Sequence, residues 1–197
     1  MQTLTKVYDR HEHARQVVSD LEREGIPSSS ISLLANKSIS EQHADVENAS
    51  EAGTGAGVGA VVGGTAGLLT GLGILAIPGL GPVVAAGWLA TTALGALAGG
   101  VTGGITGGIV GALIDAGVPE EHAHIYSEAV RRGGTLVSVR AEDSKAVIVQ
   151  AILDRYSPMD PVRQGAEYRK TGWNQFDPDA PPYVPDGIEV ERIKRVK

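Results

Sequence analysis

The chain has 197 residues, a formal net charge of −6 and no cysteine. The acidic balance argues against general nucleic-acid binding, which needs basic patches. The lack of cysteine excludes disulfides, thiol catalysis and cysteine-ligated metals. Charge is distributed very unevenly, because every residue from Ala52 to Ile114 is uncharged and all charged residues lie outside this block.

The N-terminal residues 1–36 are predicted to form a strand, a helix and a second strand. Residues 3–8 are rich in β-formers, and Asp9 stands three residues before Glu12, which is the spacing of a capping box at a helix start. Gly25 is a natural helix end, and residues 31–35 (ISLLA) form an apolar run typical of a buried strand. This segment is interpreted as the first half of a small α+β domain.

The middle of the chain is predicted to be a helical hairpin, residues 53–118, that follows a polar linker, residues 37–52. Two prolines and two glycines within residues 77–82 (IPGLGP) end a helix and turn the chain. The break divides the uncharged block into one helix near 54–76 and a second near 83–114.

Each predicted helix carries five glycines at a spacing of four. They are Gly55, Gly59, Gly63, Gly67 and Gly71 in the first, and Gly95, Gly99, Gly103, Gly107 and Gly111 in the second. Such a stripe lets another backbone approach closely, as in small-xxx-small helix packing. Ten helical glycines cost about 10 kcal/mol relative to alanine, so burial against a partner must offset that cost. These glycines are predicted to be the helix-packing and oligomerisation residues.

Globular patterning returns in residues 119–157, interpreted as the second half of the α+β domain. A helix is expected from Pro119, ending at Gly133, followed by a strand at 135–140 and a helix at 144–156. The predicted fold class is therefore α+β: a small ferredoxin-like domain, βαβ plus αβα, split by a glycine-zipper antiparallel helical hairpin.

The last 40 residues, 158–197, are predicted to be an extended tail with one short helix near 188–195. The tail holds the chain's only phenylalanine and one of its two tryptophans in a proline-rich, polar context. Aromatic residues in such a segment often dock into a groove. Trp173, Phe176 and Tyr183 are predicted to dock on the α+β domain or on a neighbouring subunit.

Two environments for the hairpin remain open from the residues alone. Stretches of about 20 apolar residues can span a bilayer, and both ends would lie on one side, with Trp88 at an interface. The flanks are acidic, however, and residues 38–130 contain no lysine or arginine, so the positive-inside signal is missing. The alternative is a water-soluble homo-oligomer. The N-terminus has no apolar signal-like stretch, which favours a cytoplasmic or cytoplasmic-side location.

No catalytic residue, metal or cofactor is predicted. His11 with His13, and His122 with His124, stand two apart, a spacing that separates their side chains around a helix and favours solvated helix ends over joint metal ligation. Residues 53–59 (GTGAGVG) lack the lysine ending of a phosphate loop.

The ARQVVSDLEREG pattern, the ISLLA strand, the AGVGAVVGGTAGLL block and the GWNQFDPDAPPY segment together resemble the bacterial general stress protein 17M-like (YflT-type) family. The resemblance implies a stress-related protein without assigned chemistry. The sequence thus predicts a non-enzymatic protein whose partner is itself, with a lipid membrane as a further partner and no nucleic acid. Its hairpin is expected to drive membrane association and homo-oligomerisation; the alternative is a soluble ring or shell with hairpins inside.

Overall fold

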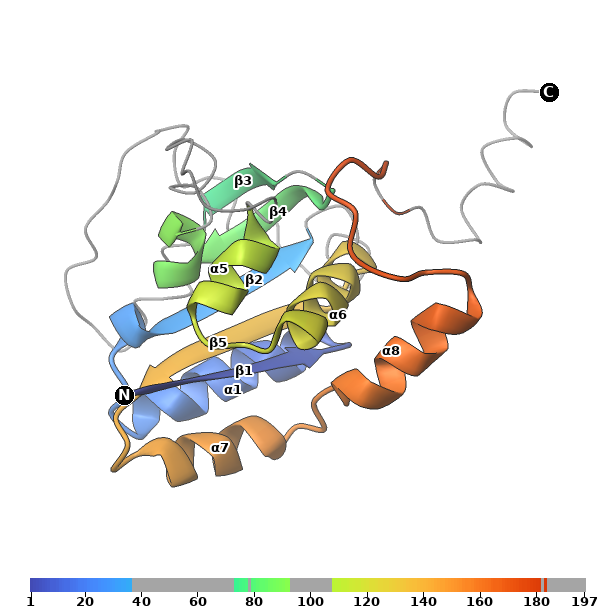
Figure 1. Cartoon of the computed structure of the whole chain (residues 1–197). Helices are drawn as coiled ribbons and strands as arrows, with labels where there is room; N and C mark the ends of the chain where they lie inside the picture. The colour runs from blue at the N-terminus through green and yellow to red at the C-terminus, as the bar shows by residue number, and fades with distance from the viewer. Residues whose placement is uncertain (37–72, 78, 93–107, 182, 184–197) are drawn as a thin grey trace.

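The computed structural model describes residues 1–36, 73–77, 79–92, 108–181 and 183 (Figure 1). The fold is α+β, as predicted, with a five-stranded antiparallel sheet in the order β1-β5-β2-β4-β3. The strands are β1 (Gln2–Tyr8), β2 (Ile31–Asn36), β3 (Gly73–Ile77), β4 (Gly81–Ala86) and β5 (Thr135–Ala141). The helices are α1 (His11–Arg23), α5 (Ile109–Asp115), α6 (Glu120–Arg131), α7 (Ala146–Asp154) and α8 (Pro161–Lys170), with a 3-10 turn at Ser28–Ser30.

Strand connections repeat one topological relation. β1 and β2 each pair antiparallel with β5, so they run parallel to one another, and α1 joins them across the intervening strand. This is a split β–α–β unit. β2 and β3 stand in the same relation on either side of β4, and residues 37–72 connect them.

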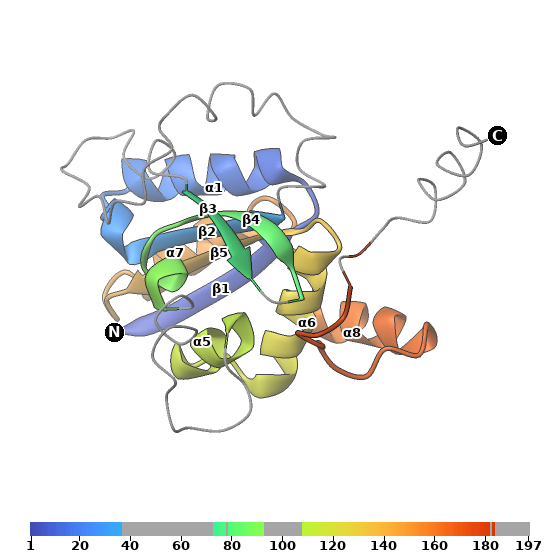
Figure 2. The same cartoon turned by 90° about the horizontal axis from the view of Figure 1, so that it is seen from above.

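The sheet separates two apolar layers. One face carries Tyr8, Leu33 and Val137 and packs on α1 and α7; the other carries Val7, Leu34 and Leu136 and packs on α5 and α6. Consecutive strand residues point to opposite faces, which is why each strand supplies both layers. Figure 2 shows α1 on one side of the sheet and α5 and α6 on the other.

The strand, helix and strand predicted in residues 1–36 correspond to β1, α1 and β2, but the helix begins one residue later than predicted. Arg10 is the N-cap of α1 and makes no side-chain cap bond, so the predicted Asp9 cap is wrong. Gly25 ends the helix region with φ +76°, a left-handed conformation that glycine adopts without strain. The helix, strand and helix predicted in residues 119–157 correspond to α6, β5 and a shorter α7 at Ala146–Asp154.

The predicted turn at residues 77–82 joins two strands, so the helical interpretation is wrong on both sides of it. β3 and β4 pair antiparallel, with Ile77 opposite Gly81, and β4 also pairs with β2. Apolar runs of five and six residues bounded by turn residues are compatible with either a buried strand or a helix segment. Pairing with β2 selects the strand, so residues 73–77 and 81–86 belong to the sheet.

The predicted second helix, 83–114, is also interrupted. Residues 88–92 are helical, and α5 begins anew at Ile109 after Gly108, whose φ of +83° is incompatible with a continuous helix. Trp88 is 8% exposed in the core, so it is not a membrane-interface residue. In the portion of the chain that the structure describes, no helix is both long enough and apolar enough to cross a bilayer.

The segment after α7 was predicted to be extended, and this is wrong in part, because α8 occupies Pro161–Lys170. The Asp160 side chain accepts a hydrogen bond from the Arg163 N–H at 3.0 Å, and Pro161 takes the first helical position. An aspartate cap followed by proline is a strong helix-start signal. The short helix expected near 188–195 lies outside the described residues.

Candidate functional site

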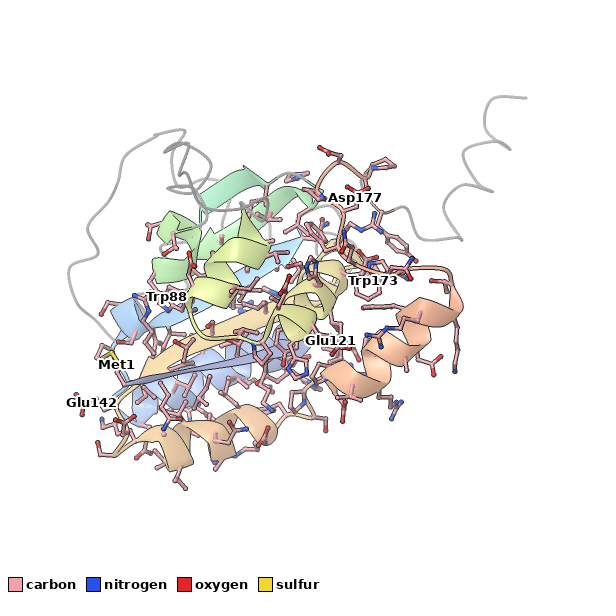
Figure 3. All side chains as sticks on the ribbon, in the orientation of Figure 1. Met1, Trp88, Glu121, Glu142, Trp173 and Asp177 are labelled. Carbon is pink, nitrogen blue, oxygen red and sulfur yellow. The ribbon has the colours of Figure 1, made fainter. Side chains whose placement is uncertain are left out.

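The best-defined site is a docked tail, residues 173–181 and 183, lying against α6, α8 and the β3–β4 turn. Phe176 is 4% exposed and belongs to the core layer of α5 and α6. Its N–H donates a hydrogen bond to His124 Nδ1 at 3.3 Å. Figure 3 shows Trp173 and Asp177 on the segment that follows α8, beside α6. The tail is therefore an integral part of the fold.

The β3–β4 turn is shaped to receive this segment. Gly79 has φ +75°, and a Cβ there would lie 2.7 Å from Pro178 Cα and 2.8 Å from Phe176 Cζ. Such distances are far below van der Waals contact. Asn36 Nδ2 donates to the Leu80 carbonyl at 3.0 Å from the other side. The turn is thus held between the end of β2 and the docked tail.

A charged cluster at the end of α6 anchors the last described residues of the tail. Glu128 is fully buried and receives hydrogen bonds from Arg131 Nε (2.9 Å), Arg131 Nη2 (2.8 Å) and Arg132 Nε (2.6 Å). Arg131 Nη1 also donates to the Pro181 carbonyl at 3.1 Å. The buried carboxylate fixes the two guanidinium groups by charge-assisted bonds, so they can hold the tail.

Aromatic rings cover the two arginines. The Arg132 guanidinium lies 4.4 Å from the ring centroid of Tyr168 and 5.2 Å from that of Tyr183, within cation–π range. Burial raises the pKa of the Tyr168 hydroxyl to about 12, although the nearby Arg132 opposes the shift. Trp173 packs edge-on against Tyr168, with centroids 5.5 Å apart. All three residues that the sequence singled out for tail docking therefore contact α6, α8 or the core.

A shallow cleft of about 280 Å³ lies beside Trp173, at the start of α6 and the end of α8. Its lining residues are Glu120, Glu121, His124, Arg169, Trp173, Asn174 and Gln175. Glu121 and Arg169 form an ion pair across it, so two of its charges are already satisfied. Trp173 Nε1 is buried without a hydrogen-bond partner. The lining contains no serine, threonine or cysteine that could pair with His124 as a nucleophile.

The histidines that the structure describes are dispersed. His11 Nδ1 lies 3.3 Å from Thr135 Oγ1, and burial, with Arg15 adding to it, lowers the pKa of His11. His13 packs on the Tyr156 ring, and His122 on Tyr126. Within the described ranges, no group of three or more His, Cys, Asp or Glu residues could hold a metal ion.

Only one of the ten zipper glycines lies in the described part of the chain. Gly111 is partly buried in α5, the helix that packs against α6. Gly55, Gly59, Gly63, Gly67, Gly71, Gly95, Gly99, Gly103 and Gly107 lie outside the described residues. Their packing role stays a prediction.

Trp88 joins the sheet to the second glycine-rich segment. The Arg140 guanidinium of β5 stacks over its ring at 3.6 Å from the centroid. The next residue, Leu89, donates its N–H to Ser32 Oγ of β2 at 2.9 Å. These contacts were not predicted, because Ser32 and Arg140 have no sequence feature that distinguishes them from ordinary strand residues. The start of this helix is thus fixed on the sheet.

Comparison of the chain with protein-family models, curated proteins and solved structures found no match.

Proposed function

We propose that this protein is a non-enzymatic, self-associating protein in which the α+β domain displays two glycine-rich segments that pack against those of other copies. In this proposal the core of the domain is a ferredoxin-like split β–α–β unit, and the β3–β4 hairpin adds two strands to its sheet. The stress-related role implied by the family resemblance belongs to the same proposal.

The observation that carries the proposal is the anchoring of both segments. The segment 37–72 leaves from the end of β2 and returns at the start of β3, and these strands flank β4. Two strand spacings and a shift of about two residues place its ends about 12 Å apart. The segment 93–107 leaves from the helical residues 88–92 and returns to α5. Each segment is thus held at both ends by the folded domain.

The composition of these segments supports packing between copies. No charge occurs from Ala52 to Ile114, so two copies meet without electrostatic repulsion in this region. The regular spacing of the glycines favours close backbone approach, and the helical cost of the glycines is offset only when a partner covers them. A flexible linker would instead be rich in serine and other polar residues.

Membrane association, on the cytoplasmic side, is the second candidate. It is favoured by residues 52–72, an uncharged stretch whose length matches the ~20 residues that a bilayer-spanning helix needs. The second segment offers less. Trp88 and Leu89, at the start of the helical residues 88–92, are buried in the domain core, and the 15 residues 93–107 that follow this helix are fewer than the ~20 that a span needs.

The test replaces glycines in both segments. The double variant Gly63→Leu, Gly103→Leu is expected to lower the molar mass of the assembly below that of the wild type in sedimentation velocity. The matched double variant with alanine should retain the assembly, because alanine preserves a small-residue groove. A wild-type chain that is monomeric in both buffer and detergent, or a leucine variant that assembles like the wild type, refutes the proposal.

Carbonate extraction of membranes separates the two candidates. Full recovery of the protein in the soluble fraction, as one large species, supports the soluble assembly and refutes membrane insertion. Retention in the pellet until detergent is added supports membrane association. The stress-related part is tested by the abundance of the protein before and after heat and salt stress; unchanged abundance contradicts it.

A further inference from the structure

The two edges of the sheet differ in how they are protected. At the β1 edge, the N–H of Met159 donates to the Val7 carbonyl at 2.8 Å, so the chain after α7 covers part of this edge. β1 also carries Lys6, whose ammonium pairs with Asp154 at 3.1 Å. A covering segment and a lysine are two devices by which proteins prevent edge-to-edge pairing.

In the part of the chain that the structure describes, the β3 edge shows neither device. Within the described residues, β3 pairs with β4 alone, so its outer row of backbone N–H and C=O groups has no strand partner there. The strand sequence is GILAI, with no charge and no proline. Ile74 is 57% exposed although it lies opposite the buried Val84. An uncharged apolar edge of this kind is a template for another strand.

The β3–β4 hairpin is also held in place from behind. Leu80 in its turn accepts a hydrogen bond from Asn36, and Gly79 lies directly against Phe176 and Pro178 of the docked tail. A strand that is already ordered loses little conformational entropy when a partner pairs with it. The edge is therefore preorganised for pairing.

We propose that β3 pairs antiparallel with β3 of a second copy of this chain, joining two five-stranded sheets into one ten-stranded sheet. This inference rests on the proposed self-association and adds a second contact, separate from the glycine-rich segments. A second copy is the occupant that the charge pattern fits, because a two-fold interface is formed by the same surface patch on both copies. A charged edge would repel its copy, and this edge lies within the uncharged block Ala52–Ile114.

The two-fold axis passes through the middle residue of the strand, Leu75. It pairs Gly73 with Ile77 of the partner subunit and places the two Ile74 side chains diagonally on the same face of the joined sheet. Diagonal neighbours across a strand pair are about 7–8 Å apart, within reach of two isoleucines. Pairing thereby reduces the exposure of Ile74, which the isolated chain leaves largely in water.

The experiment uses full-length charge variants at one position. Ile74→Lys and Ile74→Glu are each expected to weaken self-association by about tenfold or more, because like charges then face each other across the axis. An equimolar mixture of the two variants should restore association at low salt. Val147→Lys is the matched control: Val147 is 82% exposed on α7, far from β3, and its variant should associate like the wild type.

A cross-link provides the second measurement. The chain has no cysteine, so a single introduced thiol reports one contact. Leu75→Cys should form a disulfide-linked dimer under mild oxidation much faster than Val147→Cys. Circular dichroism and thermal unfolding of each variant confirm that the fold is retained.

Several results would overturn the inference. Ile74 variants that associate like the wild type, variants that are weakened but not restored by mixing, or equal cross-linking rates at positions 75 and 147 each do so. If the glycine variants dissociate while the Ile74 variants do not, the edge pairing fails and the proposed function stands. If the Ile74 variants dissociate while the glycine variants do not, the edge pairing stands and the proposed glycine packing fails.

Discussion

Replacing Phe176 with alanine tests whether one ring holds the tail on the domain. Phe176 is 4% exposed and packs in the α5–α6 core layer. A buried aromatic side chain removes about 150–250 Å² from water, which at ~25 cal/mol per Å² is about 4–6 kcal/mol as an upper bound. Measured core Phe→Ala changes cost about 3–5 kcal/mol.

The tail can respond by leaving the domain instead of tolerating a cavity. A loss of about 3 kcal/mol changes the docking equilibrium roughly 150-fold, which converts a tail that is 99-to-1 docked into one that is mostly released. Amide hydrogen exchange should then show loss of protection in residues 173–183. Protection in β5 and β2 should remain, because each of these strands is paired with a neighbouring strand on both sides.

The matched control is Val162→Ala in α8, an apolar truncation at a side chain that is 70% exposed. It should change the free energy of unfolding by less than about 0.5 kcal/mol. Unchanged exchange of the tail in Phe176→Ala would refute the anchoring role of this ring. Equal loss of protection throughout the sheet would also refute it, since Phe176 would then be an ordinary core residue.

Two further predictions concern buried polar groups. Glu128→Gln should lower the free energy of unfolding in urea by about 2–3 kcal/mol, because Arg131 and Arg132 lose a charged acceptor while still largely buried; a change below about 0.5 kcal/mol would contradict this account. Burial raises the pKa of Tyr126 and of Tyr168 to about 12. Both hydroxyls therefore hold their proton more tightly in the folded chain, so their contribution to stability is complete below pH ~10 and is lost as the pH rises from about 10 to 12. Burial also raises the pKa of Tyr8, so absorbance at the tyrosinate wavelength should show three tyrosines titrating late, and titration of all five near pH 10 would contradict the burial.

The sequence was informative wherever local signals and tertiary packing agree. α1 and α6 have apolar residues at helical spacing, and β5 alternates as a strand, so their predicted positions are close to those observed. The prediction of Asp9 as the helix cap was wrong by one residue, since Arg10 is the N-cap. The spacing of a capping box does not distinguish between adjacent residues as the cap when the turn from β1 sets where the helix starts.

The β3–β4 hairpin was not predictable from the glycine spacing alone. Glycines at regular intervals favoured two helices that reached into residues 73–76 and 83–86 on either side of the predicted turn, but these residues are strands because β4 pairs with β2, a contact distant in sequence. α8 was predictable in principle, because Asp160 followed by Pro161 is a helix start; the proline content of the tail obscured it. The docking of the tail aromatics depends on Gly79, whose role is visible only when the turn and the tail meet.

The anchoring of residues 37–72 has a consequence for how this protein can vary during evolution. The sheet fixes where this segment starts and ends, and the free-energy cost of closing a flexible loop grows only by about 0.6 kcal/mol for each doubling of its length. Insertions or deletions of whole four-residue units between Asn36 and Gly73 would therefore leave the strand pairing of the domain intact. Natural variants that differ in the number of glycine units, but share the same sheet, are the expected outcome.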